Sequence, residues 1–312
     1  MAATHTDIRP ALVVHGGAAA SIDAIDGCRR SAQRGLQQLS ESNHSLEAVV
    51  AAVVELEDDG RFNAGSGVDV GLDGHTMVAD AGVMDTRGRL GAVASLPALR
   101  NPVLVARAVS DTPHCLLAGA GALRFARLLK LDHPIRASQR AQKKHRDLLA
   151  RLGQPGGSDE FPGFDNGVFQ RLWNYELRWE SALQEFGCGT VGAVARDAQG
   201  HFAVASSTGG SAPSLDGRVG DTPIIGCGFY AGPVGAVAVT GIGEFVVRKM
   251  MAHTVYDWLA SGEKLQPALE RAVGLMPSEV DFGIIGVTAD ETGAASNRTM
   301  PHAVAEDEKA KT

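Results

Sequence analysis

The chain has 312 residues, 44% of them hydrophobic, and 29 basic against 36 acidic residues give it a formal net charge of −7. This size and composition predict a globular protein of one large or about two smaller domains, and the lack of a long basic block argues against nucleic acid or an anionic membrane as a partner. Four dispersed cysteines without a CxxC pair argue against a zinc site or disulfide framework, and an N-terminus without an apolar h-region predicts a soluble cytoplasmic protein.

The first part of the chain predicts short blocks of strands and helices. Asp73-Gly74 between two apolar runs is a strong hairpin signal, and proline after Asn101 suits the first position of a helix. The pattern predicts a strand at residues 11–14, helices at 22–39 and 45–56, an irregular loop at 56–67, strands at 68–72, 76–84 and 91–96, and helices opening at 101–102 and covering 116–131.

The composition changes after Asp132. We interpret residues of about 132–187 as a variable linker region, with a basic helical run that forms a solvated helix face, an aperiodic Gly/Pro/acid-rich stretch and a helix at 168–183. Beyond it, the pattern predicts strands at 190–196, 202–208, 224–231 and 235–240, helices at 244–261 and 267–276, and a last strand at 282–289. Because the elements come in blocks and both ends contribute strands, we expect two sheets covered by helices in a single domain over 1–312.

Thr190 stands at the start of one of these strands, directly after Gly189. A threonine inside a chain has no strong base of its own, but cleavage of the Gly189–Thr190 bond would give it a free α-amine. Such an amine has an unperturbed pKa of about 7.7 to 8.0 and would stay fixed beside the hydroxyl. One residue would then supply nucleophile and base. The four residues Gly-Thr-Val-Gly alone still favour a plain strand start, so the choice depends on the rest of the chain.

Eight segments, in order, carry a family resemblance: VVHGGA, LEDDGRFNAGSG, ADAGVMD, LRNPVLVAR, GTVGAVA, SSTGG, GRVGD and TGIGE. Each is weak alone, but their order is highly specific. From Leu12 to about Val287 the chain resembles the plant-type asparaginases, also called isoaspartyl peptidases, a family of N-terminal-nucleophile hydrolases. The resemblance implies an α+β fold, the four-layer αββα sandwich, and self-cleavage into an α chain, 1–189, and a β chain, 190–312, that remain one folded unit.

The resemblance also implies the residues of the site. Thr208 would help hold the charge of the Thr190 nucleophile, although a strand-terminal turn residue is the simpler interpretation. Arg218 and Asp221, in a loop with Gly220, would bind the carboxylate and the ammonium of the aspartyl group, where the alternative is an exposed ion pair.

The segments TGIGE and FNAG carry the remaining implied roles. Thr240 and Gly241 would line the oxyanion hole and, with Gly243, the substrate pocket, although a plain strand-to-helix turn fits these residues equally well. Asn63 would position the amino group of Thr190 rather than merely occupy a left-handed turn. His15 is expected in a glycine-rich loop near the scissile bond and not as a general base.

No cofactor is required by the resemblance, but it implies a structural sodium ion. The matching family segment wraps Na⁺ with backbone carbonyls, which suit hard cations. By match, the residues here are Leu56, Glu57, Asp59, Phe62, Ala64 and Ser66.

The implied activity is hydrolysis of isoaspartyl (β-aspartyl) dipeptides and L-asparagine with release of L-aspartate, by a homodimer of αβ units. Three departures from the family pattern leave the preferred substrate open. They are Cys188 before Gly189, Ser214 in place of a usual lysine, and Ile242 in place of a polar residue. Alternatives are a glycosylasparaginase, against which the missing signal peptide and the GTVG form count, and an unprocessed binding protein on the same scaffold. A nucleotide-binding oxidoreductase is a further alternative, but the sequence has no full GxGxxG motif between a strand and a helix to support it.

Overall fold

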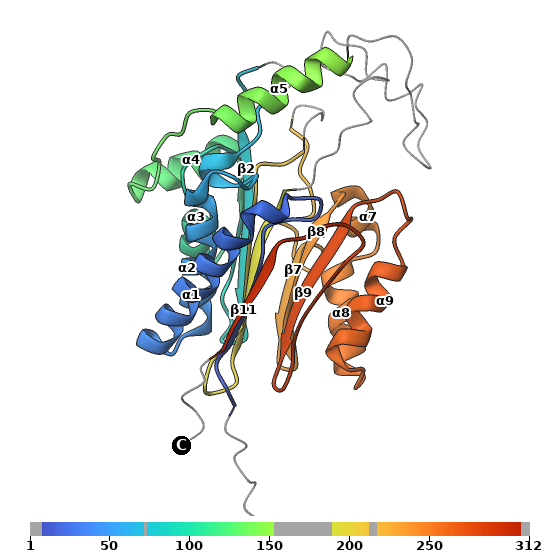
Figure 1. The fold of residues 1–312 in the computed structure, drawn as a ribbon. Coiled ribbons are helices and arrows are strands. Elements are labelled where there is room, and N and C mark those ends of the chain that lie inside the picture. Colours follow the sequence, from blue (N-terminus) through green and yellow to red (C-terminus); the bar gives the residue numbers. More distant parts are fainter. Residues whose placement is uncertain (1–7, 72–73, 153–188, 212–216, 307–312) are drawn as a thin grey trace, which may run out of the picture.

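A computed structural model of the chain describes residues 8–71, 74–152, 189–211 and 217–306 (Figure 1). Two β-sheets lie face to face at its centre, and helices cover the outer face of each (Figure 1). The molecule therefore has the four αββα layers that the sequence predicted. Among the described residues, none of the helices combines the length and apolar character that crossing a membrane requires.

The larger sheet contains strands from both sides of the predicted cleavage point. Its order is β11-β1-β5-β6-β2-β3-β4, antiparallel except for the β3–β4 pair. The strands are β1 (Ala11–His15), β2 (Val78–Asp85), β3 (Leu90–Pro97), β4 (Leu116–Ala118), β5 (Val191–Arg196), β6 (Phe202–Thr208) and β11 (His302–Glu306). Since β1 lies between β11 and β5, segments before and after Gly189 are joined by sheet hydrogen bonds.

The smaller sheet packs on the larger one through a mainly apolar layer. Its strands, all antiparallel, are in order β10 (Thr292–Ser296), β9 (Phe282–Thr288), β8 (Gly235–Gly241) and β7 (Phe229–Gly232). Side chains alternate between the faces of a strand. In β5, Val194 joins the core between the sheets, whereas Val191 and Ala193 face the helices. Burial on both faces explains why β5 and β6 lack polar alternation.

Helices close both outer faces. On the larger sheet lie α1 (Ile25–Ser42), α2 (Ser45–Asp59), α3 (Pro102–Val109) and α4 (Gly119–Leu128), and on the smaller sheet lie α8 (Met251–Ala260) and α9 (Leu265–Gly274) (Figure 1). The short helix α7 (Gly243–Arg248) follows β8, and α5 (Gln139–Leu152) crosses one end of the molecule (Figure 1). Two 3-10 turns, η1 (Ile22–Ala24) and η2 (Gly65–Gly67), belong to the loops at that end.

Several sequence predictions of secondary structure were wrong, each through a tertiary or local effect. Residues 68–71 form no strand. The strand predicted to pair with them, β2, pairs instead with β3 on one edge and β6 on the other. The predicted helix at 116–131 begins as the edge strand β4, which pairs with β3. The predicted helix at 244–261 is divided at Met250, whose φ of 44° is left-handed. Residues 224–228 turn before β7, with Cys227 N donating to Ile224 O.

Other elements were missed or cannot be compared. The strands β10 and β11 were not predicted, because neither is a continuous apolar run: both are half-exposed edge strands. The predicted hairpin residue Asp73, the Gly/Pro-rich stretch at 153–167 and the helix at 168–183 lie outside the described residues.

Candidate active site

Gly189 and Thr190 lie immediately before β5, and Thr190 is only 5% exposed. The loop after β1 rests on the bond between them. A Cβ added to Gly17, whose φ is +104°, would lie 3.0 Å from Gly189 Cα and 3.1 Å from the Gly189 carbonyl carbon. Only glycine combines this φ with so close an approach. The glycine-rich loop therefore lies near the Gly189–Thr190 bond, where the sequence predicts cleavage.

Two further threonines lie near Thr190. Val191 pairs with Ser207 in the antiparallel register of β5 and β6, so Thr190 and Thr208 follow at adjacent strand ends. The Thr208 hydroxyl accepts a hydrogen bond from Gly210 N at 3.2 Å. The buried Oγ1 of Thr222 lies 3.4 Å from Oγ1 of Thr190. Sequence reasoning missed Thr222, and its place directly after GRVGD was the only available signal.

A small cavity brings seven of the predicted residues together. Its lining contains Gly189, Thr190, Thr208, Arg218, Gly220, Asp221 and Gly241, with Gly210, Ser211 and Thr222 added. Its free space for a water-sized sphere is about 10 Å³, which is roughly the room for one water molecule. Gly189 forms part of the wall, so the uncut chain itself fills the space beside Thr190.

Arg218 is largely buried and held by a partner that the sequence did not reveal. Its Nε and Nη2 donate to Oε1 and Oε2 of Glu244, each at 2.9 Å, which is the bidentate geometry of a strong ion pair. The pair excludes the alternative of an exposed arginine in a loop, since its side chain is only 14% exposed. Burial raises the pKa of Glu244, but the pair with Arg218 outweighs burial and holds that pKa below its usual range.

Asp221 is a buried carboxyl with an unused oxygen. It is 3% exposed, and its Oδ2 has no hydrogen-bond partner among the described residues. Burial raises the pKa of Asp221 to about 7, against the attraction of Arg218. Two glycines permit this packing. A Cβ on Gly243 would lie 2.9 Å from both Arg218 Nη2 and Asp221 Oδ1, and one on Gly220 would lie 2.7 Å from Arg218 Nη1.

Thr240 and Asn63 do not line this cavity. The buried Thr240 hydroxyl accepts a hydrogen bond from Ala18 N at 3.3 Å and so ties β8 to the loop after β1. Asn63 Nδ2 donates to Gly210 O at 2.7 Å, and its Oδ1 accepts from Asp69 N at 2.8 Å. A Cβ on Gly189 would lie 2.3 Å from Asn63 Cβ. Asn63 therefore packs against Gly189, the residue before the predicted cleavage point.

His15, at the end of β1, is completely buried. Burial, with a contribution from His302, lowers the pKa of His15 to about 3. The imidazole is thus neutral and a weak base at neutral pH, which agrees with its expected structural role.

Comparison with known proteins decides the family. The sequence profile described as Asparaginase matches residues 8–312. The chain belongs to this asparaginase family. It is 34% identical to the isoaspartyl peptidase/L-asparaginase of Macaca fascicularis over 320 residues, which cover 97% of this chain and 95% of that protein. It is 36% identical to the plant-type L-asparaginase of Pyrococcus furiosus over 275 residues, which cover 85% of this chain and 84% of that protein.

In this asparaginase-family chain, the loop between α2 and η2 has features that fit a hard cation. A Cβ on Gly65 would lie 2.8 Å from Glu57 O, and one on Gly67 would lie 1.9 Å from Phe62 O. Two carbonyls of the predicted set thus border spaces that only glycine leaves open. Carbonyl oxygens are suitable ligands for such an ion. Ala64 O accepts a hydrogen bond from Gly67 N at 3.0 Å, which holds the turn closed.

Proposed function

We propose that the protein cleaves itself between Gly189 and Thr190 and then hydrolyses isoaspartyl dipeptides and L-asparagine, releasing L-aspartate. Family membership and the names of the relatives support this activity. The main structural support for this activity is a single cavity that is lined by Thr190, Arg218 and Asp221. A nucleophile next to a paired site for a carboxylate and an ammonium suits a substrate that is an amino acid with a side-chain amide.

Self-cleavage begins with attack of Thr190 Oγ1 on the carbonyl carbon of Gly189. The C–N bond breaks as the amide nitrogen of Thr190 takes up a proton, and the resulting ester is hydrolysed by water. The close contact of Gly17 with this bond supports a defined peptide geometry for the attack. Because β1, β5 and β11 are neighbours in one sheet, we expect the α chain 1–189 and the β chain 190–312 to remain one domain.

In the mature enzyme, the α-amine of Thr190 removes the proton from its own hydroxyl, and Oγ1 attacks the side-chain amide carbon of the substrate. Arg218 binds the α-carboxylate of the aspartyl group and Asp221 its ammonium. We assign oxyanion stabilisation to Thr240 and Gly241 and support of the nucleophile to Thr208. Ammonia or an amino acid leaves with the proton. Water then hydrolyses the acyl ester and restores Thr190.

Asn63 would orient the new amine of Thr190 once cleavage frees Gly189, against which it now packs. Thr222 adds a second hydroxyl beside the nucleophile. We further propose a structural Na⁺ held by backbone carbonyls of the loop at 56–66, a homodimer of αβ units and a cytoplasmic location. The location is supported by Cys28, Cys115 and Cys227, which are free thiols.

The test measures aspartate released from β-aspartyl-leucine and from L-asparagine, with N-acetylglucosaminyl-asparagine as a third substrate. Wild type should show two chains by intact mass and release aspartate from the first two substrates. Thr190→Ala should remain a single chain and lose activity by about a thousandfold or more. A chain that stays uncut before Thr190 and still releases aspartate would refute the proposal. An unchanged KM in Arg218→Ala would refute the carboxylate clamp.

A further inference from the structure

A second and larger cavity adjoins the one that holds Thr190. Its volume is about 490 Å³, and its walls include Gly16, Ala20, Asn63, Arg140, Lys144 and Gly189. That volume is within the range of sites for small molecules. Among the described residues, Gly189 alone lines both cavities. The second cavity therefore begins where the residue before the scissile bond lies.

The wall formed by α5 carries excess positive charge. Arg140 and Lys144 are four residues apart and so lie on one face of the helix. Both bind the same buried carboxylate: Arg140 Nη2 lies 2.7 Å from Asp69 Oδ1, and Lys144 Nζ lies 2.5 Å from Asp69 Oδ2. Two cations therefore share one anion that is only 3% exposed. In addition, Nε of Arg140 is buried without a hydrogen-bond partner among the described residues.

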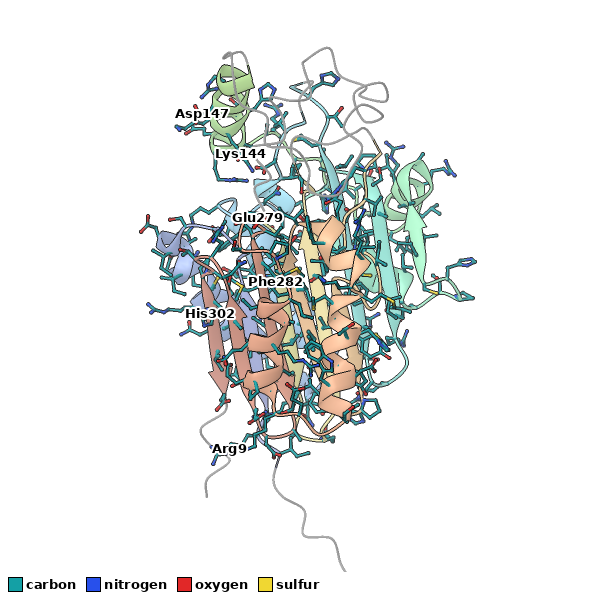
Figure 2. All side chains as sticks on the ribbon, turned by 90° about the vertical axis from the view of Figure 1, so that its right-hand side faces the viewer. Arg9, Lys144, Asp147, Glu279, Phe282 and His302 are labelled. Carbon is teal, nitrogen blue, oxygen red and sulfur yellow. The ribbon has the colours of Figure 1, made fainter. Side chains whose placement is uncertain are left out.

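Two other charged residues, Arg61 and Asp23, also line this cavity. Arg61 pairs with Asp59 and Asp26. Asp23, on the exposed turn η1, accepts a hydrogen bond from the Ser21 hydroxyl at 3.1 Å. The local excess of positive charge therefore lies at α5, whereas the carboxylate of Asp23 comes from η1. Figure 2 shows Lys144 at the end of the molecule that α5 crosses, whereas Asp147 points outward from that helix.

We infer that this second cavity is the leaving-group subsite, which receives the amino acid that follows an isoaspartyl linkage, and that Arg140 and Lys144 attract its α-carboxylate. The inference rests on the proposed function. The aspartyl half of the substrate would take the space beside Thr190, Arg218 and Asp221 that Gly189 helps to fill in the uncut chain, and this space has no room for a further residue. The half that departs must lie beyond the scissile carbonyl, and Gly189, a free chain end after cleavage, is the wall that can move between the two spaces.

Substrate preference follows from this arrangement. Ammonia, the leaving group of asparagine, has no carboxylate and gains nothing from the cations of α5. A dipeptide with a free α-carboxylate gains their attraction in binding and in the transition state. The second cavity therefore favours isoaspartyl dipeptides over asparagine.

The experiment compares three substrates: β-aspartyl-leucine, the same dipeptide with its C-terminal carboxyl converted to an amide, and L-asparagine. The main variant is Lys144→Gln, because Arg140 continues to pair with Asp69 in it. We expect kcat/KM for β-aspartyl-leucine to fall roughly three- to fivefold, and kcat/KM for the amidated dipeptide and asparagine to change by less than about twofold. Lys144→Glu should deepen the selective loss.

The matched control is Lys143→Gln, which removes a charge from the exposed face of the same helix, where Lys143 pairs with Asp147. It should leave all three substrates unaffected. Equal losses on all three substrates in Lys144→Gln, or no loss on β-aspartyl-leucine, would overturn the inference. Failure of the wild type to release aspartate from any of the three would instead contradict the proposed function.

Discussion

Arg218 and Glu244, which are 26 residues apart in the chain, form a bidentate ion pair. Nε and Nη2 of the arginine each lie 2.9 Å from a carboxylate oxygen of the glutamate. This contact occupies one edge of the guanidinium. Among the described residues, no hydrogen-bond partner is seen on the edge formed by Nη1 and Nη2, which has the geometry to bind a second carboxylate in the same bidentate way. Glu244 thus orients the arginine that we propose to bind substrate.

The first prediction concerns this orientation. Glu244→Gln removes the charge that holds Arg218 but keeps the shape of the side chain. We expect KM for asparagine to rise about tenfold and kcat to change by less than about threefold, since Glu244 acts through Arg218 on binding. Steady-state kinetics measure both values. Glu263→Gln, at an exposed pair with Arg271, is the control. A fall in kcat at constant KM would show that Glu244 does not act as a positioning residue.

A second prediction concerns Gly17 and self-cleavage. Gly17→Ala places a Cβ 3.0 Å from Gly189 Cα and at an unfavourable φ of +104°, so the loop must shift away from the scissile bond. We expect the two chains to appear at least about tenfold more slowly after synthesis. Timed denaturing gels measure this rate. Gly88→Ala has a similar φ of +95° with no atom within 4 Å of the added Cβ, and it should be cleaved at the normal rate. Equal rates for both variants would contradict the prediction.

A third prediction concerns pH and Asp221. Burial raises the pKa of Asp221 to about 7, and only the ionised carboxylate attracts the ammonium of the substrate. KM for asparagine should therefore fall as pH rises through about 7, and Asp221→Asn should abolish this dependence while raising KM. The amine of Thr190, with an unperturbed pKa of about 7.7 to 8.0, would act on kcat instead. A KM that is constant between about pH 6 and about pH 8 would rule out this role of Asp221.

A fourth prediction concerns stability and Glu57. Glu57 is completely buried, its Oε1 accepts from Val103 N at 3.1 Å, and its Oε2 accepts from Asn101 Nδ2 at 3.2 Å. It thereby satisfies a backbone N–H at the start of α3. Burial raises the pKa of Glu57 to about 8. Because the folded pKa exceeds that of the unfolded chain, about 4.3, the folded state binds the proton more tightly, and this stabilisation is lost as pH rises through about 8.

Glu57→Gln cannot ionise. From about pH 6 to about pH 8 the wild type should therefore lose free energy of unfolding relative to this variant, on the order of 2 kcal/mol. Urea unfolding at the two pH values measures the difference. Glu41→Gln, on the exposed side of α1, is the control and should follow the wild type. The same pH dependence in wild type and Glu57→Gln would exclude a buried titrating carboxyl at this position.

The sequence by itself determined the family, the four layers and most of the candidate site. Strand and helix patterns are local, and the GTVG, SSTGG and GRVGD segments place Thr190, Thr208, Arg218 and Asp221 at strand ends and in a glycine-rich loop. In the folded chain these side chains line one cavity. The residues that we propose to bear the chemistry were recognisable because motif and backbone turn coincide there.

Only the tertiary structure decided which residues act on those side chains. The partner of Arg218 is Glu244, the hydroxyl beside Thr190 is that of Thr222, and the cations that bind Asp69 come from a helix interpreted as solvated. Likewise, β4 is a strand because the edge of β3 offers hydrogen bonds, and β11 because β1 does. Such choices depend on contacts between segments distant in sequence, and no local pattern records them, since each segment's own preferences are weaker than the packing that finally places it.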